Sequence, residues 1–250
     1  MKKVVDFIKQ VFRWIFRMIF FLFVFSIAIV IFYRFVPPPF TPLMLIRCYE
    51  KGTFNIHKDY VSLDKISPDL ALAVVAGEDN NFLIHNGFDF DAIKKAVKFN
   101  EEHKKKTIGA STISQQTAKN VFLWNGRTYL RKGFEVYFTC LIETFWSKKR
   151  IMELYLNEIE MGDGIYGAET AAKTYFKKPA KNLSRKEAAL ISAIIPNPLH
   201  WSPLQPNATV NYRQEVILWN MNNIMKVDYD KPVKPVVPPI NTGTKSNKTK

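Results

Sequence analysis

The longest uninterrupted apolar stretch of the chain lies near its N-terminus. From Met18 to Tyr33, Ser26 is the only strongly polar residue, and the apolar character continues to Pro37. A helix needs roughly 20 mainly apolar residues to cross the bilayer core of about 30 Å. A cleaved signal peptide has a shorter apolar region that ends in small residues, and this segment offers no such site. We therefore predict a transmembrane signal anchor at residues 18–36, preferring it to a signal peptide.

Downstream of the anchor, the polar and apolar positions are typical of helices. Ser67-Pro68-Asp69 combines an N-cap residue, a first-turn proline and a first-turn acid. These residues precede an apolar segment that ends at Ala76. The pattern predicts a helix here, with Glu78 at its end.

Further helix starts are marked by capping residues. Thr112 with Gln115 and Ser184 with Glu187 fit the capping box. Ser147 can cap a helix whose apolar residues have helical spacing, namely Ile151, Leu154, Tyr155 and Ile159. Runs of period two bounded by turns are nearly absent, so we predict a mainly α domain.

Prolines mark both ends of this domain. Pro37 to Pro39 form a stiff spacer after the anchor. From about Asp230 the chain is rich in Pro, Asn, Thr, Ser and Lys and has little to bury, so we predict a disordered tail. The predicted organisation is a basic cytoplasmic segment at 1–17, the anchor at 18–36, one domain at 37–229 and the tail at 230–250.

The chain is strongly basic, with 36 Lys and Arg against 22 Asp and Glu and a net charge of +14. This charge suits nucleic acid, an anionic membrane surface or a phosphorylated substrate. By the positive-inside rule, the N-terminus is cytoplasmic and the domain is exported, because five bases precede the span: Lys2, Lys3, Lys9, Arg13 and Arg17. Export excludes nucleic acid as a partner.

Glu78 and Glu135 each lie in a polar block that core packing does not require. A carboxyl group at a helix end in a glycine-flanked loop can reach a cleft. Burial among apolar neighbours would raise its pKa toward the range that is useful for proton transfer. The alternative is a solvated acid at the end of a helix.

A polar stripe lies between the two glutamates. Thr112, Gln115, Gln116 and Lys119 are spaced i, i+3, i+4 and i+7, so they share one helical face. Such side chains bind sugar or phosphate oxygens, although a solvated helix face has the same pattern. Arg131 lies four residues before the second glutamate, a spacing that an exposed ion pair would also have. The pattern alone leaves these alternatives open.

Several long motifs occur in a specific order. They are Glu-Asp-x-x-Phe-x-x-His-x-Gly-Phe-Asp from Glu78, Gly-x-Ser-Thr-Ile-x-Gln-Gln from Gly109, Arg-Lys-x-x-Glu from Arg131 and the block 149–157. In this order the chain resembles the peptidoglycan glycosyltransferases, the lysozyme-like enzymes that polymerise lipid II. The similarity runs from about residue 42 to 203. Ala110 replaces the glycine of most of that family, as in its monofunctional Gram-negative branch.

The resemblance implies a mainly α, lysozyme-like glycosyltransferase domain preceded by the single N-terminal transmembrane helix. It implies polymerisation of lipid II into β-1,4-linked glycan by inverting displacement of undecaprenyl pyrophosphate. The matched segment fills the region after the anchor and leaves no room for a transpeptidase domain, so no cross-linking is expected.

The resemblance also implies roles for individual residues. Glu78 would be the catalytic base, and Glu135 the second catalytic glutamate, which orients cations, holds a divalent metal or stabilises positive charge at the sugar ring. Pyrophosphate and sugar binding is implied for Lys119, Arg127, Arg131, Lys132, Ser111, Thr112, Gln115 and Gln116. Supporting roles are expected for Asp79, His85, Glu153 and Asn157.

The four histidines have no paired spacing, so a built-in metal site is not expected. Any metal would be a loosely held Mg²⁺ or Mn²⁺ that bridges phosphate and carboxylate. The expected partners are lipid II, the growing lipid-linked glycan, the membrane, and proteins of cell division or elongation. The branch resemblance implies an inner-membrane protein whose catalytic domain faces the periplasm.

Two alternatives remain open from the sequence. A membrane-anchored lysozyme-like lytic enzyme would also use a glutamate at a helix end, but it does not need a basic pyrophosphate site. A non-catalytic cell-wall scaffold would explain the anchor and the charge, but it would leave both acidic motifs unused.

Overall fold

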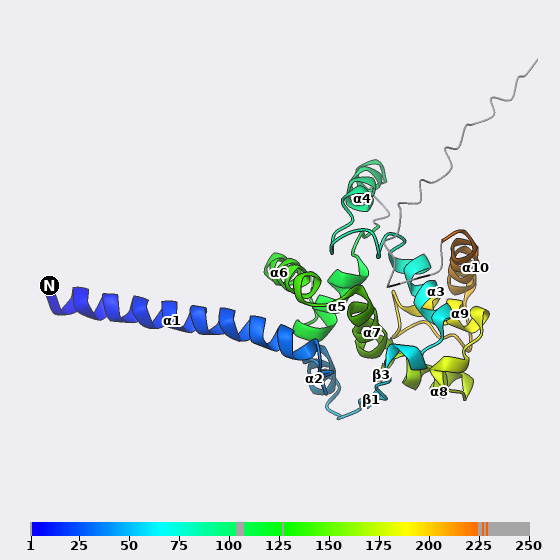
Figure 1. Cartoon of the computed structure of the whole chain (residues 1–250), viewed down its shortest axis with the longest axis horizontal. Helices are drawn as coiled ribbons and strands as arrows, with labels where there is room; N and C mark the ends of the chain where they lie inside the picture. Colours follow the sequence, from blue (N-terminus) through cyan, green and yellow to red (C-terminus); the bar gives the residue numbers. More distant parts are fainter. Residues whose placement is uncertain (1, 104–107, 127, 225–226, 228, 230–250) are drawn as a thin grey trace, which may run out of the picture.

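The computed structural model describes residues 2–103, 108–126, 128–224, 227 and 229. Figure 1 shows a long N-terminal helix that leads into a domain built mainly of helices. Within the described residues, strands account for only three short segments, which confirms the predicted mainly α class. The predicted tail at 230–250 and the predicted binding residue Arg127 lie outside the described residues.

Helix α1 (Lys2–Tyr33) is continuous and extends away from the domain (Figure 1). It includes the predicted basic segment and ends shortly before the proline spacer. It is long and apolar enough to cross a membrane. Val30 is its only buried residue, because it lies where the helix meets the domain.

Helix α3 (Pro68–Glu78) forms the centre of the domain, and every residue from Leu70 to Ala76 is buried. Helices α9 (Arg185–Ile194) and α10 (Ala208–Asn223) pack against it. A Cβ atom at Gly77 would lie 2.7 Å from Ser192 Oγ of α9, so the glycine permits this close approach. The end of α3 is therefore held between two other helices.

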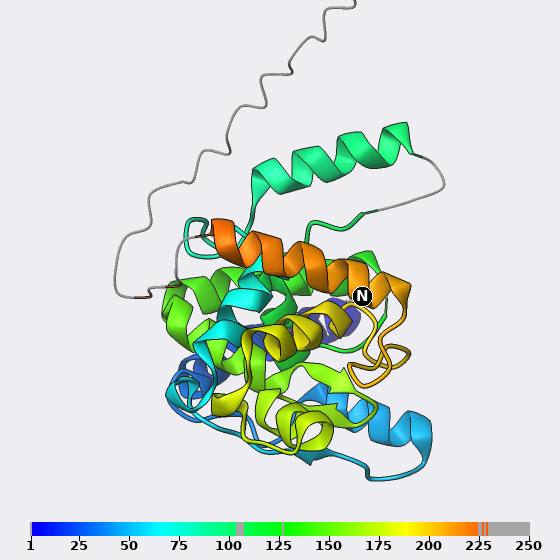
Figure 2. The same ribbon diagram turned by 90° about the vertical axis from the view of Figure 1, so that its right-hand side faces the viewer.

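A second group of helices packs beside the first. Helix α5 (Ile113–Phe122) contacts both α6 (Tyr129–Phe145) and α7 (Lys148–Glu158). Helix α4 (Phe90–Glu102) lies apart from these helices, as Figure 2 shows. Together α3, α5 and α6 carry most of the predicted site residues.

The predicted helix starts are largely confirmed. Capping boxes form at Thr112 and at Ser184, and the Ser147 side chain accepts the backbone N–H of Arg150. Ser67 occupies the N-cap position of α3 as predicted, but its hydroxyl donates to the carbonyl of Leu183 at 3.1 Å instead of capping the helix.

A small mixed sheet lies beside α8 (Ala168–Phe176). Its order is β1-β3-β2, from β1 (His57–Lys58), β2 (Glu160–Gly162) and β3 (Ile165–Tyr166). Strand β3 pairs in parallel with β1 and antiparallel with β2. The sheet ties the segment after the anchor to the end of α7.

The remaining elements connect these layers. Helix α2 (Pro42–Lys51) follows the proline spacer and buries Leu43 and Met44 in the domain. Two short 3₁₀ turns, η1 (Leu63–Lys65) and η2 (Ala180–Asn182), flank the start of α3 and the end of α8.

Candidate active site

Glu78 is the last residue of α3, at the predicted position. One carboxylate oxygen accepts the side-chain amide of Gln116 at 2.9 Å, and the other accepts the guanidinium of Arg213 at 3.1 Å. The side chain is only 13% exposed. Burial raises the pKa of Glu78, although the hydrogen bond from Gln116 and the charge of Arg213 oppose the rise.

The amide of Gln116 is itself held in place. Tyr155, a buried residue of α7, donates its hydroxyl proton to Gln116 Oε1 at 3.2 Å. Since the amide oxygen accepts from Tyr155, the amide nitrogen is turned toward Glu78. Two helices thereby fix the orientation of the Glu78 carboxylate.

Asp79 and His85 join the loop after α3 to the start of α5. His85 Nε2 lies 2.9 Å and 3.0 Å from the two carboxylate oxygens of Asp79. The Asp79 carboxylate also accepts the backbone N–H of Ile113, and the Thr112 hydroxyl donates to the carbonyl of Gly87. These contacts make a rigid frame around Glu78.

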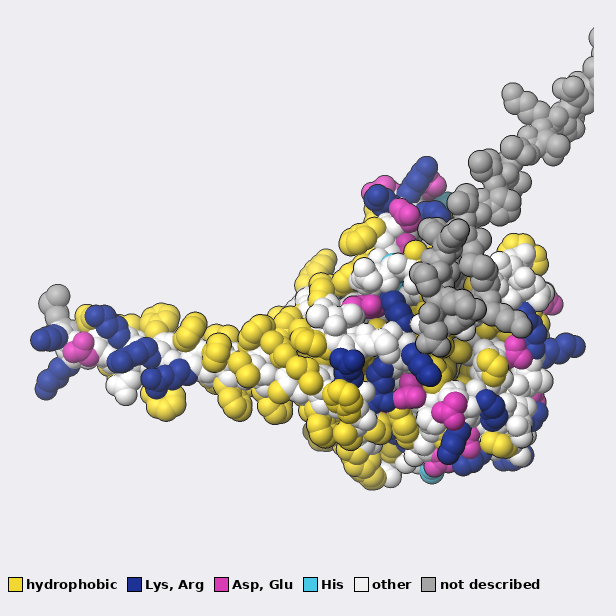
Figure 3. Space-filling model, in the orientation of Figure 1, with side chains coloured by type: hydrophobic (Ala, Val, Ile, Leu, Met, Phe, Trp, Pro, Cys, Tyr) yellow, Lys and Arg dark blue, Asp and Glu magenta, His cyan; other side chains and the backbone are white. Residues whose placement is uncertain are grey.

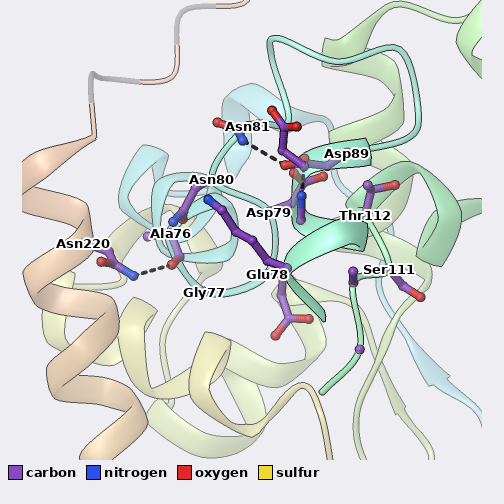
Figure 4. Close-up of a pocket in the computed structure, with 15 residues that line it drawn as sticks. Ala76, Gly77, Glu78, Asp79, Asn80, Asn81, Asp89, Ser111, Thr112 and Asn220 are labelled. Atoms are coloured by element: carbon purple, nitrogen blue, oxygen red, sulfur yellow. Dashed lines mark hydrogen bonds between the residues drawn. The ribbon is translucent and has the colours of Figure 1, made fainter. Parts of the chain in front are cut away.

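A pocket of about 340 Å³ opens on one side of Glu78 (Figure 4). It lies between the end of α3, the start of α4 and the segment before α5. Its polar lining includes Asn80, Asp89, Lys95 and Ser111. Asn220 of α10 closes one side and donates to the carbonyl of Ala76 at 3.0 Å. Lys95 and Asn220 are lining residues that the sequence did not predict.

A second pocket of about 290 Å³ lies on the other side of Glu78. Its charged lining comes from Lys119 of α5 and from Arg131, Lys132 and Glu135 of α6. Both predicted catalytic glutamates therefore line one cavity, together with three of the predicted cations. Ser111, Gln115 and Gln116 also line this cavity.

The charges in this second pocket are closely coupled. Glu135 is buried, and its carboxylate accepts from Arg131 at 2.5 Å and from Lys132. Burial lowers the pKa of Lys119; Glu135 opposes this shift, and Arg131 and Lys132 add to it. Among the described residues, Arg131 Nε is buried with no hydrogen-bond partner. The pocket thus holds three cations and two carboxylates, Glu78 and the fully paired Glu135, and this excess of cations suits an anionic ligand.

Arg213 contacts Glu78 and is a further site residue that the sequence reasoning missed. It lies on the otherwise apolar buried stripe of α10, three residues after Val210 and four before Ile217, both buried. A charged residue on such a stripe is unusual and could have marked it. Nothing in the sequence, however, connects position 213 with position 78.

The remaining predicted residues make structural hydrogen bonds, although Thr112 lines the first pocket and Gln115 the second. Thr112 and Gln115 make the capping box of α5, which occupies much of their hydrogen-bonding capacity. Glu153 accepts from the hydroxyl of Tyr60 and the backbone of Leu63, and Asn157 bonds the backbone of residue 61. Glu153 and Asn157 lie outside both pockets and tie α7 to the segment before α3.

The carboxylates of the site do not form a metal-binding cluster. No group of three or more His, Cys, Asp or Glu within the described ranges has the arrangement of a metal site. Both oxygens of Glu135 accept from cations, and Asp89 caps α4 at Ala92 while accepting from Asn81. The protein groups alone therefore do not fit a resident divalent ion.

The fold and the site together define a mainly α enzyme with a buried carboxylate between two polar pockets, one of them strongly basic. The chain matches the family model described as Transglycosylase over residues 48–222. It belongs to this transglycosylase family, whose domain is lysozyme-like.

Three relatives illustrate the similarity, and each is named a biosynthetic peptidoglycan transglycosylase. The protein from Bacteroides thetaiotaomicron is 53% identical over 225 residues, which cover 88% of this chain and 90% of the relative. The protein from Bdellovibrio bacteriovorus is 52% identical over 210 residues, with 82% and 84% covered. The protein from Haemophilus influenzae is 49% identical over 213 residues, with 83% and 87% covered.

Proposed function

We propose that this chain polymerises lipid II into β-1,4-linked glycan strands without cross-linking them. The observation that carries the proposal is the position of Glu78, a buried carboxylate of raised pKa that borders both pockets. An acceptor sugar on one side and a lipid-linked pyrophosphate on the other would both reach this group. The names of the relatives support this substrate class.

Glu78 serves as the general base of the reaction. The acceptor 4-hydroxyl attacks C1 of the donor sugar, and its proton passes to Glu78 as the new C–O bond forms. The bond from C1 to the pyrophosphate oxygen breaks on the opposite face, which inverts the configuration. Hydrogen bonds from Gln116 and Arg213 fix the orientation of the carboxylate.

The basic pocket binds the pyrophosphate that leaves. A pyrophosphate needs charge neutralisation more than protonation, and Lys119, Arg131 and Lys132 supply it. Glu135 holds two of these cations in place. Arg127 is a further predicted contact in this group.

A divalent ion would enter this site only with the substrate. Phosphate oxygens would supply most of its ligands, since the protein carboxylates are already paired. Charge neutralisation by the three cations is independent of such an ion. In the proposed mechanism, Mg²⁺ or Mn²⁺ therefore assists the three cations and is not required for charge neutralisation.

The proposed location is the inner membrane, with the catalytic domain in the periplasm. The basic residues that precede the apolar part of α1 favour a cytoplasmic N-terminus. The substrate's lipid stays in the bilayer, so an anchored enzyme keeps its cleft next to it. Proteins of cell division or elongation are the proposed protein partners.

The proposal is tested with the purified full-length protein in detergent. We expect it to convert lipid II into products of increasing size that a muramidase digests. Preformed glycan strands in a parallel reaction should stay intact. Cleavage of those strands without polymer formation would instead identify a lytic enzyme, and neither activity would leave a scaffold.

A further inference from the structure

Helix α10 carries an apolar stripe on its exposed side, separate from the stripe that packs on α3. Tyr212, Val216 and Trp219 are spaced i, i+4 and i+7, so they share one face of the helix. The two aromatic residues project into solvent, with Tyr212 68% exposed and Trp219 66% exposed. Single exposed apolar residues are normal on a protein surface, but a row of them on one helical face points to an interaction. We call these three residues the outer stripe.

The outer stripe lies next to the active site. Arg213 of the same helix donates to Glu78 at 3.1 Å, and Asn220 lines the first pocket. At 3.6 residues per turn, Arg213 and Asn220 lie along the edge of the buried stripe that is nearer to the outer stripe. A ligand that leaves the active site across α10 therefore meets the outer stripe next.

The basic pocket and α10 lie at different distances from α1. Helix α6, which carries three charged residues of the basic pocket, contacts α1, whereas α10 lies at the end of the domain opposite α1 (Figure 1). Figure 3 shows the hydrophobic surface of α1 continuing onto the adjoining part of the domain, while the visible far end is mainly polar and charged. In a bilayer that α1 crosses, the outer stripe therefore lies away from the lipid, and its occupant comes from the aqueous side.

A glycan strand linked to a pyrophosphate in the basic pocket would follow this direction. Its lipid end lies toward α1, so its hydrophilic sugars extend past Glu78 toward α10. The two pockets beside Glu78 have volumes of about 340 Å³ and about 290 Å³, near the lower end of the range of about 300–1,000 Å³ for sites that enclose one drug-sized ligand. Sugars beyond the reacting ones must therefore lie on the surface outside the pockets.

The outer stripe has the chemistry of a sugar-binding surface. Gluco-configured pyranoses in β-1,4 linkage have equatorial hydroxyl groups, so their ring faces present C–H groups, which the negatively polarised face of an aromatic ring attracts. Tyr212 and Trp219 are seven residues apart, a rise of about 10 Å along the helix. This rise is comparable to the length of one disaccharide unit. Asn223, exposed one turn after Trp219, supplies an amide oxygen that can accept from sugar hydroxyl groups.

We propose that the outer stripe of α10 is a docking surface for the sugar rings of the glycan strand whose pyrophosphate occupies the basic pocket. The inference rests on the proposed function and adds a site for the part of the strand that has already been made. The competing occupant is the apolar face of a partner protein. A flat aromatic ring is essential for stacking on sugars, whereas a protein interface also accepts an aliphatic side chain.

Calorimetric titration of the full-length protein in detergent tests this surface without turnover. The probe is a β-1,4-linked hexamer of N-acetylglucosamine, and no lipid-linked donor is present. Trp219→Leu keeps an apolar side chain but removes the flat aromatic face, and Trp219→Phe restores such a face. Tyr49→Leu is the matched control, because Tyr49 is 89% exposed and belongs to α2, near the end of α1 (Figure 1). Thermal unfolding establishes that all three variants are folded.

We expect Trp219→Leu to weaken binding of the hexamer by about tenfold, as for the loss of one aromatic stacking contact. Trp219→Phe should recover most of the affinity, and Tyr49→Leu should bind as wild type does. Absence of binding to the wild-type protein would overturn the inference. Wild-type affinity in Trp219→Leu would also overturn it and leave a partner protein as the occupant.

The length of the product provides a second readout. With lipid II as substrate, we expect Trp219→Leu to make shorter strands than wild type while the initial rate of coupling stays unchanged, because the outer stripe contacts only sugars beyond the reacting ones. A wild-type length distribution in Trp219→Leu would contradict the inference. If the wild-type protein makes no polymer but binds the hexamer through Trp219, the proposed function fails and the docking surface stands.

Discussion

Glu78 and Glu135 are both buried carboxylates of one cavity, but their surroundings differ. Glu78 accepts one neutral amide and one partly exposed guanidinium, and burial raises its pKa. Glu135 accepts from two cations that lie on the preceding turn of its own helix. The first environment favours a group that takes up a proton. The second holds a carboxylate between two cations and so fixes their positions.

The origin of the partners explains this difference. Glu135 is paired within α6, so its environment forms whenever that helix forms. The partners of Glu78 come from α5 and α10, which meet only in the folded domain. The group assigned to proton transfer is therefore the one whose surroundings depend on tertiary structure. Four substitutions test this contrast.

The largest effect is expected for Glu78→Gln. Glutamine keeps the shape but cannot accept the proton of the attacking hydroxyl, so we expect the polymerisation rate to fall about 10³-fold. The rate of polymer formation from lipid II measures the loss. Glu215→Gln on the exposed side of α10 is the control and should keep full activity. More than a tenth of wild-type turnover in Glu78→Gln would remove Glu78 as the base.

Glu135→Gln should lower activity by about 100-fold and also reduce stability. A glutamine oxygen can accept from only one of the two cations, so a buried cation loses its partner, at a cost of about 3 kcal/mol. Urea unfolding measures this change. Glu102→Gln, in the exposed pair with Lys98, should change the unfolding free energy by only about 0.5 kcal/mol. If both variants are equally stable, the pairing of Glu135 is not what holds the pocket.

Arg213→Gln tests whether the charge of Arg213 lowers the pKa of Glu78. Arg213 lowers the pKa of Glu78, so its removal should raise that pKa further. The base must be ionised to act, so the acidic limb of the pH–rate profile should move to higher pH. At acid pH we expect a rate about tenfold below wild type, as for the loss of one hydrogen bond to a charged group. Arg185→Gln, whose pair with Asp69 lies on the opposite side of α3, should leave the profile unmoved.

The raised pKa of Glu78 also affects stability. The folded protein binds a proton at Glu78 more tightly than the unfolded chain, so the stabilisation present at acid pH is lost as the pH rises through the raised pKa. Thermal unfolding at several pH values should show a smaller loss over this range in Glu78→Gln. An identical pH dependence in both proteins would mean that burial does not perturb Glu78.

The smallest effect is expected for Tyr155→Phe. The change removes one hydrogen bond to Gln116 and leaves the amide free to rotate. A hydrogen bond of this kind contributes about 1 kcal/mol, so we expect about a fivefold lower rate. Tyr175→Phe, whose hydroxyl bonds the backbone near β2, is the matched control and should keep normal turnover. A full rate in Tyr155→Phe would mean that Gln116 needs no fixed orientation.

Local sequence signals predicted much of the fold. The capping boxes at Thr112 and Ser184 and the end of α3 at Glu78 follow from neighbouring residues, which decide where a helix begins and ends. The sequence motifs also assigned Glu78, Lys119 and three residues of α6 to one site, and all of them line the basic pocket. The α6 residues are Arg131, Lys132 and Glu135. The helix ends could be predicted because each depends on a short stretch of chain, whereas the grouping of the site residues came from the family resemblance of the ordered motifs.

What the sequence could not predict depends on tertiary packing. The pairing of Arg213 with Glu78 crosses 135 positions and needs α10 to pack on α3. Leu43 and Met44 follow the proline spacer, and only the packing of α2 against the domain buries them.

Trp146 and Arg150 donate hydrogen bonds to the carbonyls of Val30 and Tyr33, so the end of α1 is attached firmly to the domain. Helix α1 has 32 residues and is about 48 Å long, and the tilt of a membrane-spanning helix depends on how its apolar length matches the local bilayer thickness. Since the last turns of α1 are bonded to α6 and α7, the domain must rotate with the helix. In a bilayer that α1 crosses, membrane thickness would then affect the angle at which the cleft faces the lipid headgroups.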